Sequence, residues 1–352
     1  MAVVIESAEV TMTQYAYTQN YTIANVGNVN KVRVVIQVNP PNGVTDEAAS
    51  SITPALTSTT NLQLRRESWG VSGQIVTVYY HIIVDDDQTV EHGEATFNQY
   101  PKNITVSDVG NLNEAYSIIY FRISNTSAIW YNLLAQHTLN ATTNLKIWTK
   151  AYSLVPIGTY QIVKNSLLSV QSIEGTATET SYNVPISTIN ESKTILRIGF
   201  DNIGSISSPN QAKISAYNTA TNIKIISYSS GTLDYTLYVI SDNRLKVQSV
   251  YESYTASSNV KTIASVDLTK TYTLLYGEKN YIASVNTGTL NLGQMYILAK
   301  LLTSTSVDIR RSNNGGAAFY IPWAVIEYTE GGQLYPFLKM IGNKIGKKIG
   351  TF

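Results

Sequence analysis

The stretch TTNLKI, residues 142–147, predicts the fold because close copies of it return along the chain. TTNLQL stands at 59–64, ATNIKI at 220–225 and the weaker TSTSVDI at 303–309. Aligning them places Asn61, Asn144, Asn222 and Ser306 in register, at nearly equal intervals. A period of roughly 80 residues indicates an internal repeat rather than chance similarity between Thr-rich segments.

Two further landmarks keep a nearly constant place relative to this phrase. The first is an aliphatic residue, a polar turn and a β-rich run, at 28–36, 111–119, 188–196 and 266–275. Its anchors are Val29, Leu112, Ile189 and Leu268, and each precedes the Asn or Ser anchor of its own repeat by a similar length of chain. The second is a glycine-containing turn followed by a long strand, at 70–84, 229–241 and 313–328, with a blurred version at 155–170.

Within each repeat the apolar residues alternate with a period of two, and Gly, Asn, Ser and Asp recur between the runs. This pattern is typical of antiparallel strands joined by turns. We therefore expect an all-β fold of tandem antiparallel β-sandwich modules, jelly-roll-like, that fold singly or in pairs. The expected domains are β modules at 1–97, 98–175, 176–256 and 257–332, followed by a basic amphipathic C-terminal helix at 333–352.

Composition narrows the functional classes. The 352 residues include 25 tyrosines but no cysteine, so disulfides and thiolate metal sites are excluded. A net charge of +1 and a charged fraction of 14% give no sign of a nucleic-acid surface, which needs clustered Lys and Arg. The start, MAVVIESAEV, lacks the pattern of a signal peptide, and no apolar run reaches the length of a membrane span. We expect synthesis in a cytoplasm.

The fourth module resembles a module repeated in structural proteins of tailed phages and related viruses. The resemblance rests on a "V-D-x-x-K" strand start and a later "T/S-x-x-L-x-R…G…W-x-V-V-E" pair of strands. The matching positions here are Val266, Asp267, Lys270, Arg310, Gly316, Trp323, Val325 and Glu327. The match is partial in the first module, at Lys31, Arg65, Gly73 and Tyr79, and weak in the second and third.

The resemblance implies a non-enzymatic building block of a virion, made in the host cytoplasm and assembled on the particle as a capsid, decoration, spike or tail component. Its expected partners are copies of itself and other virion proteins, with no sequence-specific nucleic acid and no cofactor. The repeated motif carries no catalytic residue. Its structural positions are Asn61, Asn144, Asn222, Arg310 and Trp323, expected in the core and along strand edges.

The tail LYPFLKMIGNKIGKKIGTF reads as a basic amphipathic helix. Such a helix can dock on a neighbouring subunit, lie on an anionic membrane or touch packaged nucleic acid. Membrane contact would fit the plan of a double jelly-roll major capsid protein, although that plan predicts a period about twice as long as the one seen here. The candidate contact residues are Phe337, Leu338, Lys339, Ile341, Lys344, Ile345, Lys347 and Lys348.

Other chemistry has weaker support. The three histidines, His81, His92 and His137, have no metal-ligand spacing and are expected to be packed or superficial. Asp85, Asp86 and Asp87 could hold calcium, although a solvated hairpin tip explains them as well. Exposed Tyr and Trp could bind glycans, which makes a receptor-binding fibre or adhesin the rival hypothesis. A glycan hydrolase is a more distant third, because no pair of carboxylates stands out.

Overall fold

The computed structural model describes residues 3–13, 15–40, 51–67, 75–97, 101–122, 136–148, 156–178, 181–202, 214–227, 232–254, 256–276, 297–311 and 319–329. In these residues the chain is all-β, and its strands form eight antiparallel three-stranded sheets. The only helical elements described are four 3-10 turns of three residues each. The expected C-terminal helix at 333–352 lies outside the described residues.

The sheets come in pairs of six consecutive strands. Sheet pair I consists of β1 (Val3–Met12), β2 (Thr18–Thr22), β3 (Val32–Asn39), β4 (Thr53–Ser58), β5 (Asn61–Arg65) and β6 (Val76–Asp85). Sheet pair II consists of β7 (Thr89–Thr96), β8 (Lys102–Thr105), β9 (Ala115–Arg122), β10 (Gln136–Ala141), β11 (Asn144–Trp148) and β12 (Ile157–Lys164).

Two further pairs follow in the same manner. Sheet pair III consists of β13 (Leu168–Ala177), β14 (Ser181–Pro185), β15 (Thr194–Asn202), β16 (Ile214–Asn218), β17 (Asn222–Ser227) and β18 (Leu233–Asp242). Sheet pair IV consists of β19 (Leu245–Tyr254), β20 (Ser258–Thr262), β21 (Thr271–Leu275), β22 (Leu298–Thr303), β23 (Ser306–Arg310) and β24 (Phe319–Tyr328).

Each pair has an inner and an outer sheet of fixed strand order. The inner sheets are β1-β6-β3, β7-β12-β9, β13-β18-β15 and β19-β24-β21. The outer sheets are β2-β5-β4, β8-β11-β10, β14-β17-β16 and β20-β23-β22. Outer strands such as β5 and β11 are buried at every second residue, as expected of a sheet with one wet face. The inner strand β3 is buried at seven consecutive residues, so both faces of its sheet are covered.

The recurring phrase is a tight turn that ties two parts of each pair together. In pair I the turn residues Thr59 and Thr60 join β4 to β5, and their carbonyls accept hydrogen bonds from the N–H groups of Val26 and Ile23, at 2.9 and 3.0 Å. The equivalent turns in the other pairs accept from Val109 and Val106, Ile189 and Ile186, and Val266 and Ile263. In each pair the segment between the second and third strands is therefore hydrogen-bonded to the turn of the recurring phrase.

The polar turn that follows the aliphatic residue in 28–36 and its equivalents is a capped 3-10 turn before the third strand of each pair. The turns are η1 (Val29–Lys31), η2 (Leu112–Glu114), η4 (Glu191–Lys193) and η6 (Leu268–Lys270). Their caps, Asn28, Asn111, Asn190 and Asp267, each accept a hydrogen bond from the N–H group two residues on, a standard cap. Val29, Leu112 and Leu268 begin their turns, whereas Ile189 precedes its cap.

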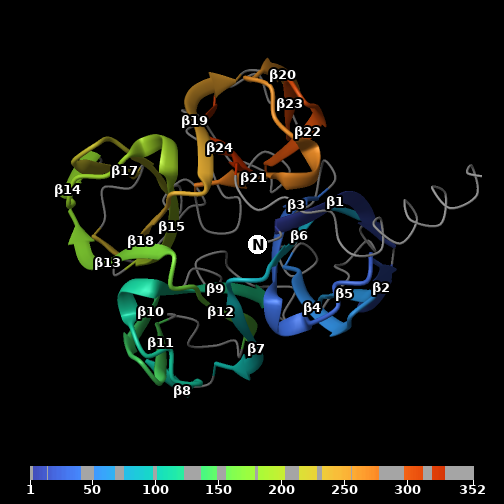
Figure 1. Cartoon of the computed structure of the whole chain (residues 1–352), viewed down its shortest axis with the longest axis horizontal. Coiled ribbons are helices and arrows are strands. Elements are labelled where there is room, and N and C mark those ends of the chain that lie inside the picture. The colour runs from blue at the N-terminus through green and yellow to red at the C-terminus, as the bar shows by residue number, and fades with distance from the viewer. Residues whose placement is uncertain are drawn as a thin grey trace, which may run out of the picture.

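The four sheet pairs surround a common centre in chain order, so that pair IV lies beside pair I (Figure 1). One buried cluster contains residues from all four pairs, among them Val35, Ile118, Ile240 and Ile326. A second cluster joins pairs I and IV, with Val34 and Val325 among its members. A third cluster fills the interior of pair II. The first two clusters show that the described chain closes on itself, with pair IV packed against pair I.

Where one sheet pair meets the next, side chains of one pair form hydrogen bonds to the backbone of edge strands in the other. Val34 lies on β3, an edge strand, and its N–H and C=O bond to the Gln161 amide of pair II at 2.7 and 2.8 Å. The N–H of Ala299, on the edge strand β22, donates to the Gln37 amide of pair I at 2.7 Å. The N–H of Leu139, on the edge strand β10, donates to the Tyr238 hydroxyl of pair III at 3.0 Å. These backbone groups of Val34, Ala299 and Leu139 thus find their hydrogen-bond partners in a neighbouring sheet pair, as buried backbone groups require. We call the edges that meet a neighbouring pair inner edges.

The predicted domain edges stay predictions. In the structure, β7, β13 and β19 are hydrogen-bonded to strands that come later in the chain, namely β12, β18 and β24. The predicted edges at 97, 175 and 256 instead assign each of these strands to the preceding module.

We expect Gln161→Leu to destabilise the fold by about 2–4 kcal/mol, because it leaves the buried N–H and C=O of Val34 without partners. Gln63→Leu, on the outer sheet of pair I, is the matched control and should cost no more than about 1 kcal/mol. Urea denaturation of both variants measures the difference. Equal midpoints would show that the amide bridge contributes nothing to stability.

Candidate functional site

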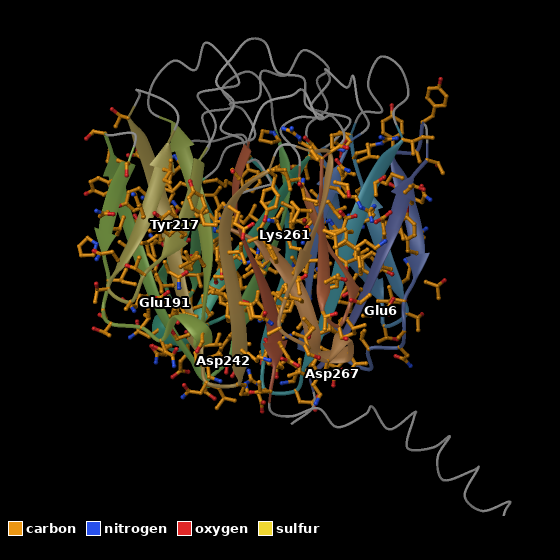
Figure 2. The ribbon with its side chains drawn as sticks, turned by 90° about the horizontal axis from the view of Figure 1, so that it is seen from above. Glu6, Glu191, Tyr217, Asp242, Lys261 and Asp267 are labelled. Carbon is orange, nitrogen blue, oxygen red and sulfur yellow. The ribbon has the colours of Figure 1, made fainter. Side chains whose placement is uncertain are left out.

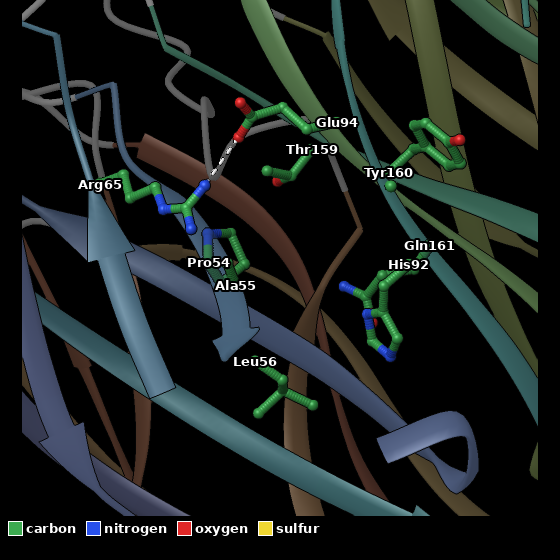
Figure 3. A pocket seen from close by; sticks show the side chains of 10 residues that line it. Pro54, Ala55, Leu56, Arg65, His92, Glu94, Thr159, Tyr160 and Gln161 are labelled. Atoms are coloured by element: carbon green, nitrogen blue, oxygen red, sulfur yellow. Dashed lines mark hydrogen bonds and ion pairs between the residues drawn. The ribbon is translucent and has the colours of Figure 1, made fainter. Parts of the chain in front are cut away.

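A cavity of about 210 Å³ lies where the outer sheet of pair I meets the inner sheet of pair II (Figure 3). Strands β4 and β5 contribute one wall, and β7 and β12 contribute the other. The lining residues are Pro54, Ala55, Leu56, Arg65, His92, Gly93, Glu94, Thr159, Tyr160 and Gln161. Because its walls come from two sheet pairs, this junction cavity exists only in the assembled chain.

Charged groups at the cavity form a balanced network. Arg65 Nη1 lies 3.0 Å from Glu94 Oε2, and Arg122 Nη1 lies 2.8 Å from the same oxygen. Arg122 also pairs with Glu67 and donates to Thr53 Oγ1 at 3.0 Å. The hydrogen bond from Arg122, with both guanidinium charges, lowers the pKa of Glu94. Glu94 is therefore ionised at neutral pH, and two arginines balance two glutamates.

His92 adds a neutral ring. Its Nε2 lies 3.2 Å from the Val29 carbonyl and 2.9 Å from the Val32 carbonyl, so Nε2 carries the proton and Nδ1 is left as an acceptor. Burial lowers the pKa of His92, although the two carbonyls oppose the change. Across the strand pair, Gly93 faces Tyr160, and a Cβ there would come within 2.1 Å of the Tyr160 ring. Glycine lets that ring lie flat over β7.

At one end of the inner strands, Arg244 joins three sheet pairs. Its guanidinium lies 2.9 Å from Asp85 Oδ2 of pair I and 2.8 Å from Asp242 Oδ2 of pair III. It also lies 2.9 Å from Asp87 Oδ2 and 5.4 Å from the centre of the Tyr328 ring. Asp85, Asp242 and Arg244 are all buried, at 1%, 2% and 4% exposure. Asp242 marks this end of the strands in Figure 2.

The calcium candidate consists of Asp85, Asp86 and Asp87. Two of these carboxylates bind the Arg244 guanidinium, and the third, Asp86, is exposed. Across the part of the chain that the structure describes, no group of three His, Asp or Glu side chains is close enough to hold a metal ion. A guanidinium therefore stands where the calcium hypothesis puts a cation.

Arg244→Met should destabilise the protein by about 3–5 kcal/mol, because it leaves two buried carboxylates without a counter-charge. Arg65→Met is the control: its ion pair with Glu94 is partly exposed, so a loss of no more than about 1 kcal/mol is expected. Chemical denaturation at pH 7 measures both. A loss below about 1 kcal/mol for Arg244→Met would contradict the structural role of this cluster.

Two other histidines are structural. His81 is fully buried, with Nδ1 2.6 Å from Ser7 Oγ and Nε2 accepting from the Thr273 N–H at 3.3 Å. His137 Nδ1 lies 2.7 Å from Ser117 Oγ. Burial, reinforced by the charge of Arg197, lowers the pKa of His81 and of His137 to about 3. Both rings are therefore neutral in the folded protein.

These depressed pKa values predict acid sensitivity. The unfolded chain binds protons below pH 6.5 while the folded chain does not, so stability is full above that pH and falls toward pH 3. Between pH 7 and pH 5 each histidine should account for a loss of about 2 kcal/mol. In the double variant His81→Asn with His137→Asn, the loss between these two pH values should be smaller by that amount for each ring replaced. Thermal unfolding at both pH values tests this, and identical pH dependence would refute it.

The three repeated asparagines lie at the start of the fifth strand of their sheet pairs and bond to polar side chains. Asn61 Nδ2 donates to Asn20 Oδ1 at 3.0 Å, and Asn144 Nδ2 donates to Asn103 Oδ1 at 3.2 Å. The third copy, Asn222, donates to Thr221 Oγ1 at 3.1 Å.

The arginine and tryptophan of the motif lie apart from each other. Arg310 Nη1 lies 3.0 Å from Glu9 Oε2, which links pair IV to pair I. Trp323 is buried, and its indole N–H donates to the Tyr254 hydroxyl at 2.6 Å.

The candidate tail contacts from Phe337 to Lys348 lie outside the described residues. No helix among the described residues is long and apolar enough to cross a membrane.

The sequence did not single out the junction cavity or Arg244. The sequence signal for Arg244 was an acid at the end of the long strand that follows the glycine-containing turn. This acid is Asp85 in one repeat and Asp242 in another. Nothing in the sequence marked the cavity, because it results from a small residue, Ala55, that faces a different repeat.

Comparison with protein-family models finds no match, and comparison with curated proteins finds none either.

Proposed function

We propose that this chain is a non-enzymatic structural protein of a virus particle, where it assembles with copies of itself and with other virion proteins. In this proposal the four sheet pairs are repeats of one jelly-roll-like sandwich module of about 80 residues. The motif around Trp323 supports the virion assignment. The treatment of strand edges supports self-assembly, and it is the observation that carries the proposal.

The two kinds of outer-sheet edge differ. The edges formed by β4, β10 and β22 lie against a neighbouring sheet pair, which supplies Arg122 to Thr53, Tyr238 to Leu139 and Gln37 to Ala299. The opposite edges, β2, β8, β14 and β20, pair with only one strand each among those described. Their residues are exposed or half-exposed, apart from Val184. An edge strand with free N–H and C=O groups is a template for pairing with another chain.

The interior supports a structural rather than a catalytic role. The two most deeply buried carboxylates among the described residues, Asp85 and Asp242, share one guanidinium instead of facing each other across a cleft. The buried histidines His81 and His137 are held neutral, with hydroxyl groups as neighbours. Such groups fix the packing of sheet pairs against one another.

Two alternatives remain within the virion proposal. A receptor- or glycan-binding fibre would use the same rigid body to present a binding surface. A membrane-contacting major capsid protein would need residues 333–352 to meet lipid.

We expect the full chain to form regular lattices, shells or defined oligomers in negative-stain microscopy and light scattering. Val260→Lys should reduce this assembly at least tenfold in threshold concentration without changing the melting temperature, because Val260 is 62% exposed on the edge strand β20. Leu167→Lys is the matched control, since Leu167 is 41% exposed but lies in the turn between β12 and β13. Two results would overturn the proposal: an original chain that stays monomeric at all concentrations, or a Val260→Lys variant that assembles as well as the original chain.

Liposomes of phosphatidylcholine with phosphatidylglycerol separate the two alternatives. Lipid-coated shells that require the segment after Gly332 would identify the membrane-contacting capsid protein. Discrete oligomers indifferent to lipid would favour a spike, fibre or tail component.

A further inference from the structure

The junction cavity has a definite structural cause. At the junction of pairs IV and I, Lys300 Nζ lies 3.0 Å from Glu9 Oε2. At the junction of pairs III and IV, the rings of Tyr217 and Tyr251 stack with centroids 4.7 Å apart. Lys300 and Tyr217 each pair with the third residue of the neighbouring outer strand, and in pair I that position is Ala55. At two other junctions a long side chain therefore occupies the position of Ala55, whereas in pair II the position is Thr138. The cavity is the space that Lys300 and Tyr217 fill at those two junctions.

The facing residues confirm that these positions correspond. Glu6 and Glu91 each accept a hydrogen bond at 2.7 Å from the backbone of the segment after the second strand of their pair. Three residues further along lie Glu9 and Glu94. Glu94 therefore faces the Ala55 space as Glu9 faces Lys300, but no side chain at position 55 reaches it.

A buried hydroxyl in the cavity lacks a partner. Thr159 is 7% exposed, and its Oγ1 has no hydrogen-bond partner in the described part of the chain. Thr159 stands directly opposite Glu94 on the neighbouring strand and lines the cavity (Figure 3). A buried polar group without a partner is unfavourable, so a ligand that bonds to this hydroxyl gains affinity. This hydroxyl both donates and accepts.

The other polar groups define the ligand chemistry. Arg65 supplies donors, the Glu94 carboxylate supplies acceptors, and His92 also lines the cavity. Because Arg65 and Arg122 balance Glu94 and Glu67, the cavity favours neither an anion nor a cation. A neutral molecule with several hydroxyl groups matches mixed donors and acceptors. The volume of about 210 Å³ is below the roughly 300–1,000 Å³ of drug-sized pockets, so it suits one small ring.

We propose that the junction cavity binds a neutral polyhydroxylated ligand, namely a single monosaccharide unit, through Thr159, Glu94 and Arg65. This inference goes beyond the proposed virion role and does not depend on it. In a virion protein the site would give contact with a surface glycan; in any other setting it remains a sugar site.

The test is saturation-transfer NMR on the full chain with methyl glucoside, methyl mannoside, methyl galactoside and N-acetylglucosamine, with sulfate and glycerol as comparison probes. At least one monosaccharide should give a signal from the ring protons. Thr159→Val, which keeps the shape but removes the unpartnered hydroxyl, should weaken binding at least tenfold while leaving the melting temperature unchanged or higher.

Ala55→Lys should abolish binding, because it fills the cavity as Lys300 fills its own junction and brings an ammonium to Glu94. Ala256→Lys, at an exposed position of pair IV, is the matched control and should bind as the original chain does. Absence of signal from every monosaccharide, binding that survives in Ala55→Lys, or binding of sulfate alone would each overturn the inference. Assembly measured on the same samples keeps this result separate from the proposed function.

Discussion

The buried ion cluster around Arg244 is the constraint on which the rest of the structure depends. A guanidinium at 4% exposure is tolerated only with counter-charges. The two buried carboxylates with which it pairs, Asp85 and Asp242, lie 159 and two positions away in sequence. Asp85 ends β6 and Asp242 ends β18, so satisfying one cation fixes the ends of two inner sheets. Tyr328, at the end of β24, lies beside the same cation. Pairs I, III and IV are thereby held in one arrangement that their apolar faces alone would leave less specified.

That arrangement explains how strand edges divide into two classes. Edges that face the neighbouring pair are satisfied by Gln161, Gln37 and Tyr238, whose polar ends replace the strand that would otherwise be missing. Edges that face outward carry exposed polar side chains and keep one side for other partners. A rigid body with bonded inner edges and open outer edges is suited to assembly, and this is the basis of the structural role that we propose.

Much of the local structure was predictable from the sequence, and much of the assembly was not. Period-two patterning and the TTN turns locate β4, β5 and their equivalents, because these features act over a few residues. The link between Arg244 and Asp85, and the pairing of Gln161 with Val34, join residues 159 and 127 positions apart, and no local pattern encodes them. The junction cavity depends on Ala55 being small against a different sheet pair. Repeat alignment identifies equivalent positions but not which of them meet.

The sheet pairs form one closed body in which side chains of one pair bond to strand edges of another. Residue-resolved amide hydrogen exchange of the full chain tests it most directly, at the N–H groups of Val34 and Ala299. Both lie on edge strands and bond to a glutamine side chain of another pair. We predict that both N–H groups are protected from exchange nearly as strongly as the N–H of Ile82, in the central strand β6. Exchange as fast as in the outward edge strand β20 would show that the sheet pairs do not close on one another.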